Sequence, residues 1–432
     1  MSRSSTDTGA SLICRMAPAL PDEASLVPQQ AMVQLLDHIR SVLVSLLSCE
    51  LQTPLSVIEV AVETLIDAPE LPVAVERQML AMALTELRQL CDSVDQFLEY
   101  TDHVWTMTWS FLKARSTPGE TPSLSSVFTE LPEALRPYEL WIEPAKARLT
   151  QFLHSMEQQA GAPFTPELMA ILEQRSQQMT AIVTHELRTP LTTLQISLES
   201  LQHENSQELE IRRCFLEVAQ QDVQRLCTVL QDLELLRRLE TGQVCFQTEP
   251  VDLRSTLQTT FNTFLRQTDQ DALSTIWIDP TARSLALLTD GARVVDVITR
   301  LLKNACQFTL NNKEVEVKAQ ILHPETQPDT ESNALPMPTL RICIEDAGRG
   351  IDAEQLERIF DCFYQVEAYL QRTIGGMGIG LTICRYLIQG MGGQIWAESA
   401  GSQQGSRFCF TLPVLPKVEA LGRVSYDSDF AR

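Results

Sequence analysis

A helical pattern occurs twice in this chain, and the two copies are offset by 136 residues without a gap. The segment SCELQTPLSVIEVAVETL begins at Ser48, and THELRTPLTTLQISLESL begins at Thr184. Apolar residues recur in both at alternating steps of four and three, the spacing that lines one face of a helix in a coiled coil or four-helix bundle. Identical residues outside this apolar face (the seam) indicate an internal duplication.

The segment that follows in each copy has a matching seam. Its residues are Leu80, Ala83, Leu87, Leu90, Val94 and Phe97 in the first copy, and Leu216, Ala219, Val223, Leu226, Leu230 and Leu233 in the second. Polar turns at DAPEL (67–71) and HENSQ (203–207) separate the paired segments. Each copy therefore predicts an antiparallel helical hairpin, the first within residues 28–104 and the second within 164–242.

The second hairpin presents a histidine. His185 lies two residues before the seam residue Leu187, about 200° round a helix of 3.6 residues per turn, so its imidazole is expected to project away from the seam, toward solvent or a partner. Glu186 is adjacent and Thr189 lies one turn further on. Pro190 removes a backbone hydrogen bond and predicts a kink or local looseness near the histidine.

The first hairpin has Cys49 where the second has His185. We favour an inactive structural copy that extends the dimer stalk or docks a partner, and a redox switch between Cys49 and Cys91 is the alternative. Cytosolic thiols are normally reduced, which weighs against the switch. The 11 cysteines have no zinc-site spacing, so we expect neither a structural metal nor an oxidised framework, and most should be small buried hydrophobes.

Charge and hydropathy exclude two classes of partner. The net charge of −22 argues against binding to nucleic acid phosphates. The most apolar early run, Met32–Leu47, carries Asp37, His38 and Arg40, so no membrane span is expected. The polar first ten residues do not resemble a secretory leader. The sequence therefore predicts a cytoplasmic protein.

The rest of the chain divides by composition. Residues 1–27 and 417–432 are expected to be loose tails, and 105–163 a proline-broken linker region with a short helix at 145–159. Residues 243–416 mix strand and helix patterns, which predicts a mixed sheet under a helical layer. The expected strands are 244–248, 275–278, 340–345, 394–398 and 407–412, the expected helices are 253–265, 292–308, 353–360 and 381–389, and an exposed loop is expected at 323–338.

Two motifs in this last region suit a nucleotide. RLLKNACQFT places Asn304 on a helix, where its amide oxygen could complete the coordination of a Mg²⁺ ion that bridges phosphates. DAGRGI follows a strand, so Asp346 could accept a hydrogen bond from an exocyclic amine. Gly348 and Gly350 would let the backbone turn tightly against a flat ring.

Two further motifs follow in sequence. ERIFDCFYQ supplies Phe360 and two more aromatic residues that could pack under a moving loop. GGMGIGL, with Gly376, Gly378 and Gly380, leads into a helix whose N-terminal amides suit phosphate. Taken singly, a short glycine run more often forms a simple turn, and an Asn on a helix is usually solvated. The four motifs in one order, after a histidine hairpin, predict a nucleotide site that serves the histidine.

In this order the motifs resemble those of bacterial two-component sensor histidine kinases, over roughly residues 167–413. HELRTPL resembles the phospho-acceptor box, LLKNA the N box, DAGRGI and GGMGIGL the two glycine boxes, and RIFDCFY the F box. The resemblance implies α plus α/β architecture: antiparallel helical hairpins of the four-helix-bundle dimerisation type, then an α/β sandwich of the Bergerat ATP-binding type. Gyrase, MutL and the ninety-kilodalton heat-shock chaperones share that sandwich.

The resemblance also implies an activity, ATP-dependent protein-histidine kinase. His185 would be phosphorylated from Mg-ATP, Glu186 would be the adjacent acid or base, and Thr189 would position water in any phosphatase reaction. Asn304 would bind Mg²⁺, and Asp346 would contact adenine. No receiver-like pattern is visible, so the phosphoryl group is expected to pass to an aspartate of a separate response regulator.

The chain departs from the family pattern at two positions. Arg300 stands where the N box usually begins with Asn, and Gln307 where a Lys or Arg commonly reaches the phosphates. Arg372 before the glycines, or Arg300 itself, could supply the missing positive charge. We expect weakened turnover, and the alternative is a nucleotide-binding pseudokinase or signalling scaffold.

The hairpins predict one of two assemblies. A two-helix hairpin leaves its apolar stripe half covered, so four-helix association is expected. Either two chains pair like with like as a homodimer, which we favour, or the first hairpin packs on the second within one chain as a pseudodimer.

Overall fold

The computed structural model describes residues 51–68, 70–115, 166–203, 209–268, 273–278, 286–309, 315–322, 338–366 and 376–414. The chain divides into two compact units. The helical unit is Met1–Gln243 with Gly375–Ile379, and the α/β unit is Val244–Ile374 with Gly380–Arg432. Helical hairpins followed by an α/β sheet domain are the fold class that the sequence predicts.

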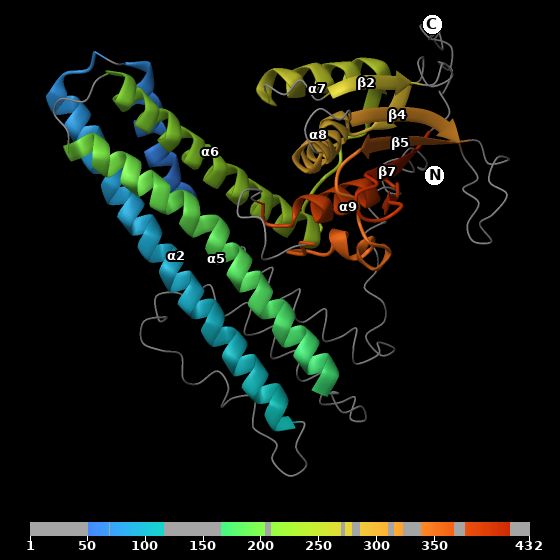
Figure 1. Ribbon diagram of the computed structural model, residues 1–432, viewed down its shortest axis with the longest axis horizontal. Coiled ribbons are helices and arrows are strands. Elements are labelled where there is room, and N and C mark those ends of the chain that lie inside the picture. The colour runs from blue at the N-terminus through green and yellow to red at the C-terminus, as the bar shows by residue number, and fades with distance from the viewer. Residues whose placement is uncertain are drawn as a thin grey trace, which may run out of the picture. The chain divides into compact units, whose positions relative to one another are not determined.

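The helical unit holds both hairpins (Figure 1). A helix over residues 51–67 and α2 (Val73–Arg115) form the first, and α5 (Pro166–His203) and α6 (Leu209–Glu240) form the second. The first turn lies where the sequence predicts it, between residue 67 and Val73, and the second predicted turn lies outside the described residues apart from His203. α5 continues through Pro190 as one helix, because a single missing amide donor removes only one of its many i to i−4 hydrogen bonds.

The seams form the core of this unit. In the two leading helices the buried seam residues are Leu51, Leu55, Ile58, Val62 and Leu65, and Leu187, Leu191, Leu194, Leu198 and Leu201, with exposures between 0% and 7%. The second segments match, apart from Phe97, which is partly exposed. The periodicity argument is therefore confirmed for both copies.

The two hairpins pack on each other within the chain. α5 contacts both α6 and α2, and the carboxylate of Glu59, in the helix over residues 51–67, lies next to the Cys227 thiol of α6. The four helices thus close one bundle. This is the pseudodimer, the alternative to the homodimer that the sequence analysis favoured.

The α/β unit contains seven strands and three α-helices among its described residues. Its helices are α7 (Leu253–Thr268), α8 (Gly291–Phe308) and α9 (Gly380–Gly390). Its strands are β1 (Glu249–Asp252), β2 (Leu273–Ile278), β3 (Ala286–Thr289), β4 (Val315–Leu322), β5 (Thr339–Asp346), β6 (Ile395–Glu398) and β7 (Ser406–Pro413).

Five strands form one sheet in the order β2-β4-β5-β7-β6, parallel only between β2 and β4, and β1 pairs with β3 separately. α8 packs on α7 and α9 and on β4 and β5, and α9 packs on β6 and β7. Leu340, Ile342 and Ile344 alternate along β5 and are fully buried. One face of the sheet therefore carries the helical layer that the sequence predicts.

Two elements differ from the sequence predictions. The strand predicted at 244–248 is absent, and β1 begins at Glu249, because β3 lies opposite residues 249–252 and the Gln247 amide instead donates to Asp290 Oδ2 at 3.0 Å. The helix predicted at 353–360 is two single 3₁₀ turns, Ala353–Gln355 and Arg358–Phe360. Eight residues are too few for a helix to propagate without tertiary support.

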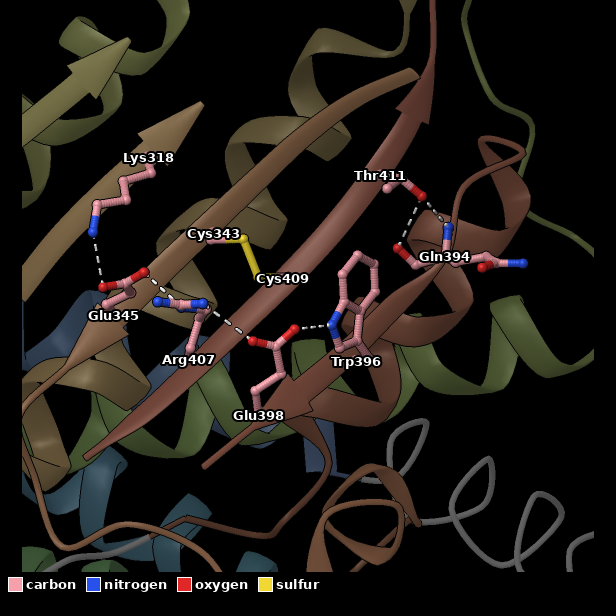
Figure 2. The surroundings of a disulfide bond; sticks show 9 residues. All are labelled: Lys318, Cys343, Glu345, Gln394, Trp396, Glu398, Arg407, Cys409 and Thr411. Atoms are coloured by element: carbon pink, nitrogen blue, oxygen red, sulfur yellow. Dashed lines mark hydrogen bonds and ion pairs between the residues drawn. A yellow bond between two sulfur atoms is a disulfide. The ribbon is translucent and has the colours of Figure 1, made fainter. Parts of the chain in front are cut away.

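A third difference concerns the cysteines. Cys343 and Cys409 form a disulfide between β5 and β7 (Figure 2), whereas the sequence analysis expected no oxidised framework. They are register partners in the sheet, with Cα atoms 4.1 Å apart. Strand pairing brings together two thiols 66 residues apart in sequence, which spacing rules along the chain do not detect. Cys91 is not disulfide-bonded.

Some expectations lie outside the described residues: those for Cys49, the tails, residues 116–163 of the linker region with its short helix, the loop at 323–337 and Arg372. The linker prediction is wrong for residues 105–115, which continue α2 to Arg115, because the first proline of this region, Pro118, comes only after them. Among the helices that the structure describes, we find none with the length and apolar character needed to cross a membrane.

Candidate functional site

His185 lies on the outer face of α5. Its side chain is 56% exposed, while Leu187 two residues later is fully buried. The helical spacing that buries the seam therefore presents the imidazole outward, as the sequence predicts. An exposed imidazole can meet a group from another domain or another protein.

Glu186 is oriented by two neighbours. Its carboxylate is 8% exposed, with Oε1 3.5 Å from Nδ1 of His185. On the other side, Arg225 Nη2 in α6 donates a hydrogen bond of 2.9 Å to Oε2. A nearly buried carboxylate requires such a partner. The pair fixes Glu186 next to the imidazole.

Sequence reasoning missed Arg225. The contact joins residues 39 positions apart, and no short motif contains both. A comparison of the two copies could have singled out Arg225, because the equivalent position in the first hairpin, 136 residues earlier, is Gln89. Asp222, one turn before Arg225, is half-buried, and burial raises the pKa of its carboxyl to about 6 although Arg225 opposes the shift.

A cavity lies beside the histidine. It measures 710 Å³ and is lined by residues of α2 and α5, including Asp102, Trp105, His185, Arg188 and Thr189. Thr189 is exposed one turn after His185. The first hairpin therefore contributes to the surface around the acceptor position.

In the α/β unit, α8 positions Asn304. Asp290 caps the helix, since its Oδ1 accepts from the Arg293 amide at 3.1 Å. The buried face comprises Val294, Val297, Ile298, Leu301, Leu302 and Ala305. Asn304 lies at the edge of that face and is partly exposed, and Gln307 is exposed. Arg300 forms an ion pair with Asp296 at 2.8 Å, so its charge is partly neutralised within the helix.

Asp346 ends β5 and is held by Ser406 at the start of β7. Ser406 Oγ donates to Oδ2 at 2.6 Å, and Oδ1 accepts from the Ser406 and Gly348 amides at 3.3 and 2.9 Å. The carboxyl is 8% exposed. Oδ2 thus keeps one lone pair for another donor. Sequence reasoning missed Ser406, which lies 60 residues away.

Two glycines after Asp346 are required by close packing. A Cβ at Gly348 would lie 2.2 Å from the Phe308 carbonyl oxygen at the end of α8. Gly350 has a φ of +71°, and a Cβ there would lie 2.0 Å from the Gly401 carbonyl oxygen. This turn is therefore pressed against the C-terminal turn of α8, four residues beyond Asn304. Asn304 and Asp346 lie at the same end of the α/β unit.

The last two motifs flank α9. Phe360 is buried, and its carbonyl oxygen accepts from Thr382 Oγ1 of α9 at 2.9 Å. Gly380 begins α9, Gly378 has a φ of +71°, and Gly376 is exposed. The glycine run therefore leads into a helix N-terminus, an arrangement that suits phosphate.

The donor set can be tested against Mg²⁺. Within the described ranges there is no group of three or more His, Cys, Asp or Glu side chains that could hold a metal ion. A single amide such as that of Asn304 fits Mg²⁺ only where phosphates and waters complete the octahedron. That is the coordination expected for a nucleotide-bound ion.

Comparison with known proteins matches both units. Residues 175–242 match the "His Kinase A (phospho-acceptor) domain", and residues 289–416 match "Histidine kinase-, DNA gyrase B-, and HSP90-like ATPase". Sensor histidine kinase WalK of Bacillus subtilis is 28% identical over 242 residues, which cover 56% of this chain and 37% of the relative. Sensor protein kinase WalK of Staphylococcus aureus is 27% identical over 243 residues, 56% of this chain and 54% of the relative.

The chain thus spans between about a third and half of the length of these relatives. Among solved structures, Acinetobacter baumannii histidine kinase AdeS matches at a TM-score of 0.40 and 21% identity, over 53% of this chain and 98% of that one. That score is too low to support a structural comparison. The two domain matches and the relatives agree: the chain contains a phospho-acceptor domain and an ATPase domain similar to those of sensor histidine kinases.

Proposed function

We propose that this chain phosphorylates its own His185 from Mg-ATP and passes the phosphoryl group to an aspartate of a separate response regulator. The observation that carries the proposal is the side-by-side placement of an exposed imidazole and a buried carboxylate that Arg225 holds in position. A histidine that is only a surface residue does not need a neighbouring carboxylate that an arginine holds in position. The match of residues 175–242 to the phospho-acceptor domain supports the same proposal.

The geometry suggests how His185 becomes a nucleophile. With its proton on Nδ1, the ring donates toward Glu186 Oε1, which leaves the Nε2 lone pair free. In the reaction a bond forms from Nε2 to the γ-phosphorus, and the bond from that phosphorus to the bridging oxygen of ADP breaks. The Nδ1 proton passes to Glu186, and ADP leaves. Most of the rate enhancement comes from positioning and charge neutralisation.

We propose that the nucleotide binds at the end of the α/β unit where Asn304 and Asp346 lie. Asp346 Oδ2 accepts the adenine amine, Gly348 and Gly350 let the backbone approach the ring, and Asn304 holds Mg²⁺, which neutralises phosphate charge when bound.

Gly376, Gly378 and Gly380 carry the phosphates, and Phe360 supports the loop before them. Arg372 is the cation that we propose for this loop. The ion pair between Arg300 and Asp296 makes Arg300 the weaker candidate.

Further assignments accompany the proposal. Thr189, one turn from His185 and exposed, is proposed to position water for hydrolysis of the phosphorylated regulator. The absence of binding to nucleic acid and the cytoplasmic location stay predictions from charge and hydropathy. A homodimer through the hairpins, favoured from the sequence, competes with the intrachain bundle.

A nucleotide-binding scaffold without kinase activity is the second candidate. Gln307 is exposed where a cation is common in the family, and Arg300 is paired with Asp296. Both features weaken the positive charge available to the phosphates. This reading predicts ATP binding without transfer.

The test is labelling of the full chain with γ-labelled ATP and Mg²⁺, scored as acid-labile, base-stable label. We expect label in the wild type, none in His185→Gln, and none in Asn304→Ala. Equal labelling of wild type and His185→Gln would assign another acceptor. ATP binding without any label would establish the scaffold. A purified receiver domain added to the labelled chain then tests onward transfer.

A further inference from the structure

We propose that the first hairpin takes the place of a second subunit, so that one chain closes its own four-helix bundle and phosphorylates itself as a monomer. The statement about phosphorylation rests on the proposed function above. The statement about the bundle rests on the packing alone. The two are tested separately below.

The apolar faces of the hairpins are already used within the chain. Leu51 and Leu187, which are equivalent seam residues, are 2% and 0% exposed, and the other seam residues are buried as well, apart from the partly exposed Phe97. Pairing with another chain through these faces would first have to separate the hairpins and expose their apolar surface to water, which is unfavourable. The face that a homodimer would use is therefore covered by the first hairpin.

An ion pair shows why the mixed pairing is preferred. Arg212 of α6 and Glu76 of α2 are partners, with side chains 24% and 17% exposed. They are 136 residues apart, so they occupy the same position in the two copies. In a two-fold arrangement, a residue that contacts its own equivalent lies at the axis. Pairing like with like would therefore set Arg212 against Arg212 or Glu76 against Glu76, and both combinations repel.

A second ion pair follows the same rule. Arg188 of α5 pairs with Asp95 of α2 at 2.6 Å. The equivalent of Arg188 in the first hairpin is Gln52, and the equivalent of Asp95 in the second is Gln231. Only the mixed pairing sets opposite charges against each other at this position. The pair is exposed and contributes little to stability, but it points in the same direction.

Only one of the two hairpins in the bundle can then accept a phosphoryl group. Only the second hairpin carries a histidine at the acceptor position, because the first has Cys49. One bundle therefore accepts one phosphoryl group, transferred from one ATP with release of one ADP. Because acceptor and ATPase domain belong to the same chain, the rate of labelling per chain should not depend on chain concentration.

The assembly is tested by exchanging the charges at the pseudo-two-fold position. We expect Glu76→Arg and Arg212→Glu each to lower the thermal midpoint of the full chain by several degrees, and the double variant to recover most of the loss. Arg213→Glu is the matched control, because Arg213 is 82% exposed and pairs with Glu217 of its own helix. Light scattering should give the mass of one chain for the wild type.

Homotypic pairing gives the opposite pattern. Each single variant would then replace one repulsive pair by another and behave like Arg213→Glu, and the double variant would recover nothing. That pattern, or a wild-type mass of two chains that persists on dilution, overturns the proposal. Neither measurement requires kinase activity, so a failure of the proposed function leaves this test intact.

Phosphorylation within one chain is tested by mixing. His185→Gln keeps the ATPase domain but lacks the acceptor, and Asn304→Ala keeps the acceptor but lacks a nucleotide contact. We expect no label in the mixture, and a wild-type rate per chain that is constant over a hundredfold range of concentration. Label on the Asn304→Ala chain, or a rate that rises with concentration, would show transfer between chains. A wild type that takes up no label contradicts the proposed function instead.

Discussion

The two hairpins have kept the same apolar seam and differ around the reactive position. Leu51 and Leu187 are equivalent and equally buried. By contrast, Gln89 stands where Arg225 holds Glu186, and Cys49 stands where His185 is exposed. Packing and phosphoryl chemistry therefore place separate demands on one hairpin. The first copy has retained the residues that close a bundle without those that surround a nucleophile.

The largest expected effect comes from moving the histidine. We expect the double variant Cys49→His with His185→Gln to take up no more than about a hundredth of the wild-type label, because Gln89 cannot replace the charged donor Arg225 and acting groups work as a unit. Labelling with γ-labelled ATP checks this. Cys49→His alone is the control and should label normally. Label above a tenth of wild type would mean that the surroundings of His185 contribute little.

Replacing a seam leucine by alanine should destabilise the chain equally in either hairpin. We expect Leu51→Ala and Leu187→Ala each to lower the free energy of unfolding by about 2–5 kcal/mol, because each leaves a cavity in the same core. Denaturant unfolding followed by helical circular dichroism measures both. Val60→Ala and Ile196→Ala are matched controls, since these equivalent residues are 60% and 56% exposed. A small loss for Leu51→Ala alone would remove the first hairpin from the common core.

Replacing Arg225 makes the second hairpin resemble the first. We expect Arg225→Gln to slow initial labelling by about 10- to 100-fold, with the KM for ATP unchanged. This is less than the roughly 10²- to 10⁴-fold contribution of a general acid or base itself, because Arg225 acts only through Glu186. Arg225→Lys should recover part of the rate, because a cation remains near Glu186. The reciprocal variant Gln89→Arg should label normally. A rise in KM without a fall in kcat would assign Arg225 to nucleotide binding instead.

The smallest effect concerns Asp222, whose carboxyl has a folded-state pKa of about 6 and an ordinary value of 3.8. Between these pH values the folded chain binds more protons than the unfolded chain, so stability falls as pH rises. Asp222→Asn should therefore raise the thermal midpoint at pH 7.5, and the gain should shrink toward pH 4.5. Glu86→Gln changes the equivalent position and is the control. A gain independent of pH would refute the assignment.

Periodicity was sufficient to predict the helical unit, because seam positions repeat over many turns and their burial follows from spacing alone. It placed His185 on the outer face for the same reason. Which hairpin packs on which could not be predicted. That choice depends on pairs such as Arg212 with Glu76, whose contact becomes visible only when the helices are assembled.

Prediction of the α/β unit was less complete, since its contacts join distant residues. Asp346 and its two glycines were predicted from a local motif, while Ser406 and the partner of Cys343 lie across a strand pair. The face that carries the disulfide also carries charges in a row: Arg407 contacts Glu345 and Glu398, and the Trp396 indole donates to Glu398 (Figure 2). No short pattern in the sequence specifies such a row.

The buried seams also bear on fidelity inside a cell. Sensor kinases share similar acceptor helices, and a free apolar face on one could pair with that of another. Along the described helices of this chain, the leucine stripes are covered by the chain's own helices and are not available for such pairing, so mixed assemblies through these faces are disfavoured without a dedicated repulsive element. An inactive variant of this chain would for that reason not assemble with an active copy and would not inhibit it.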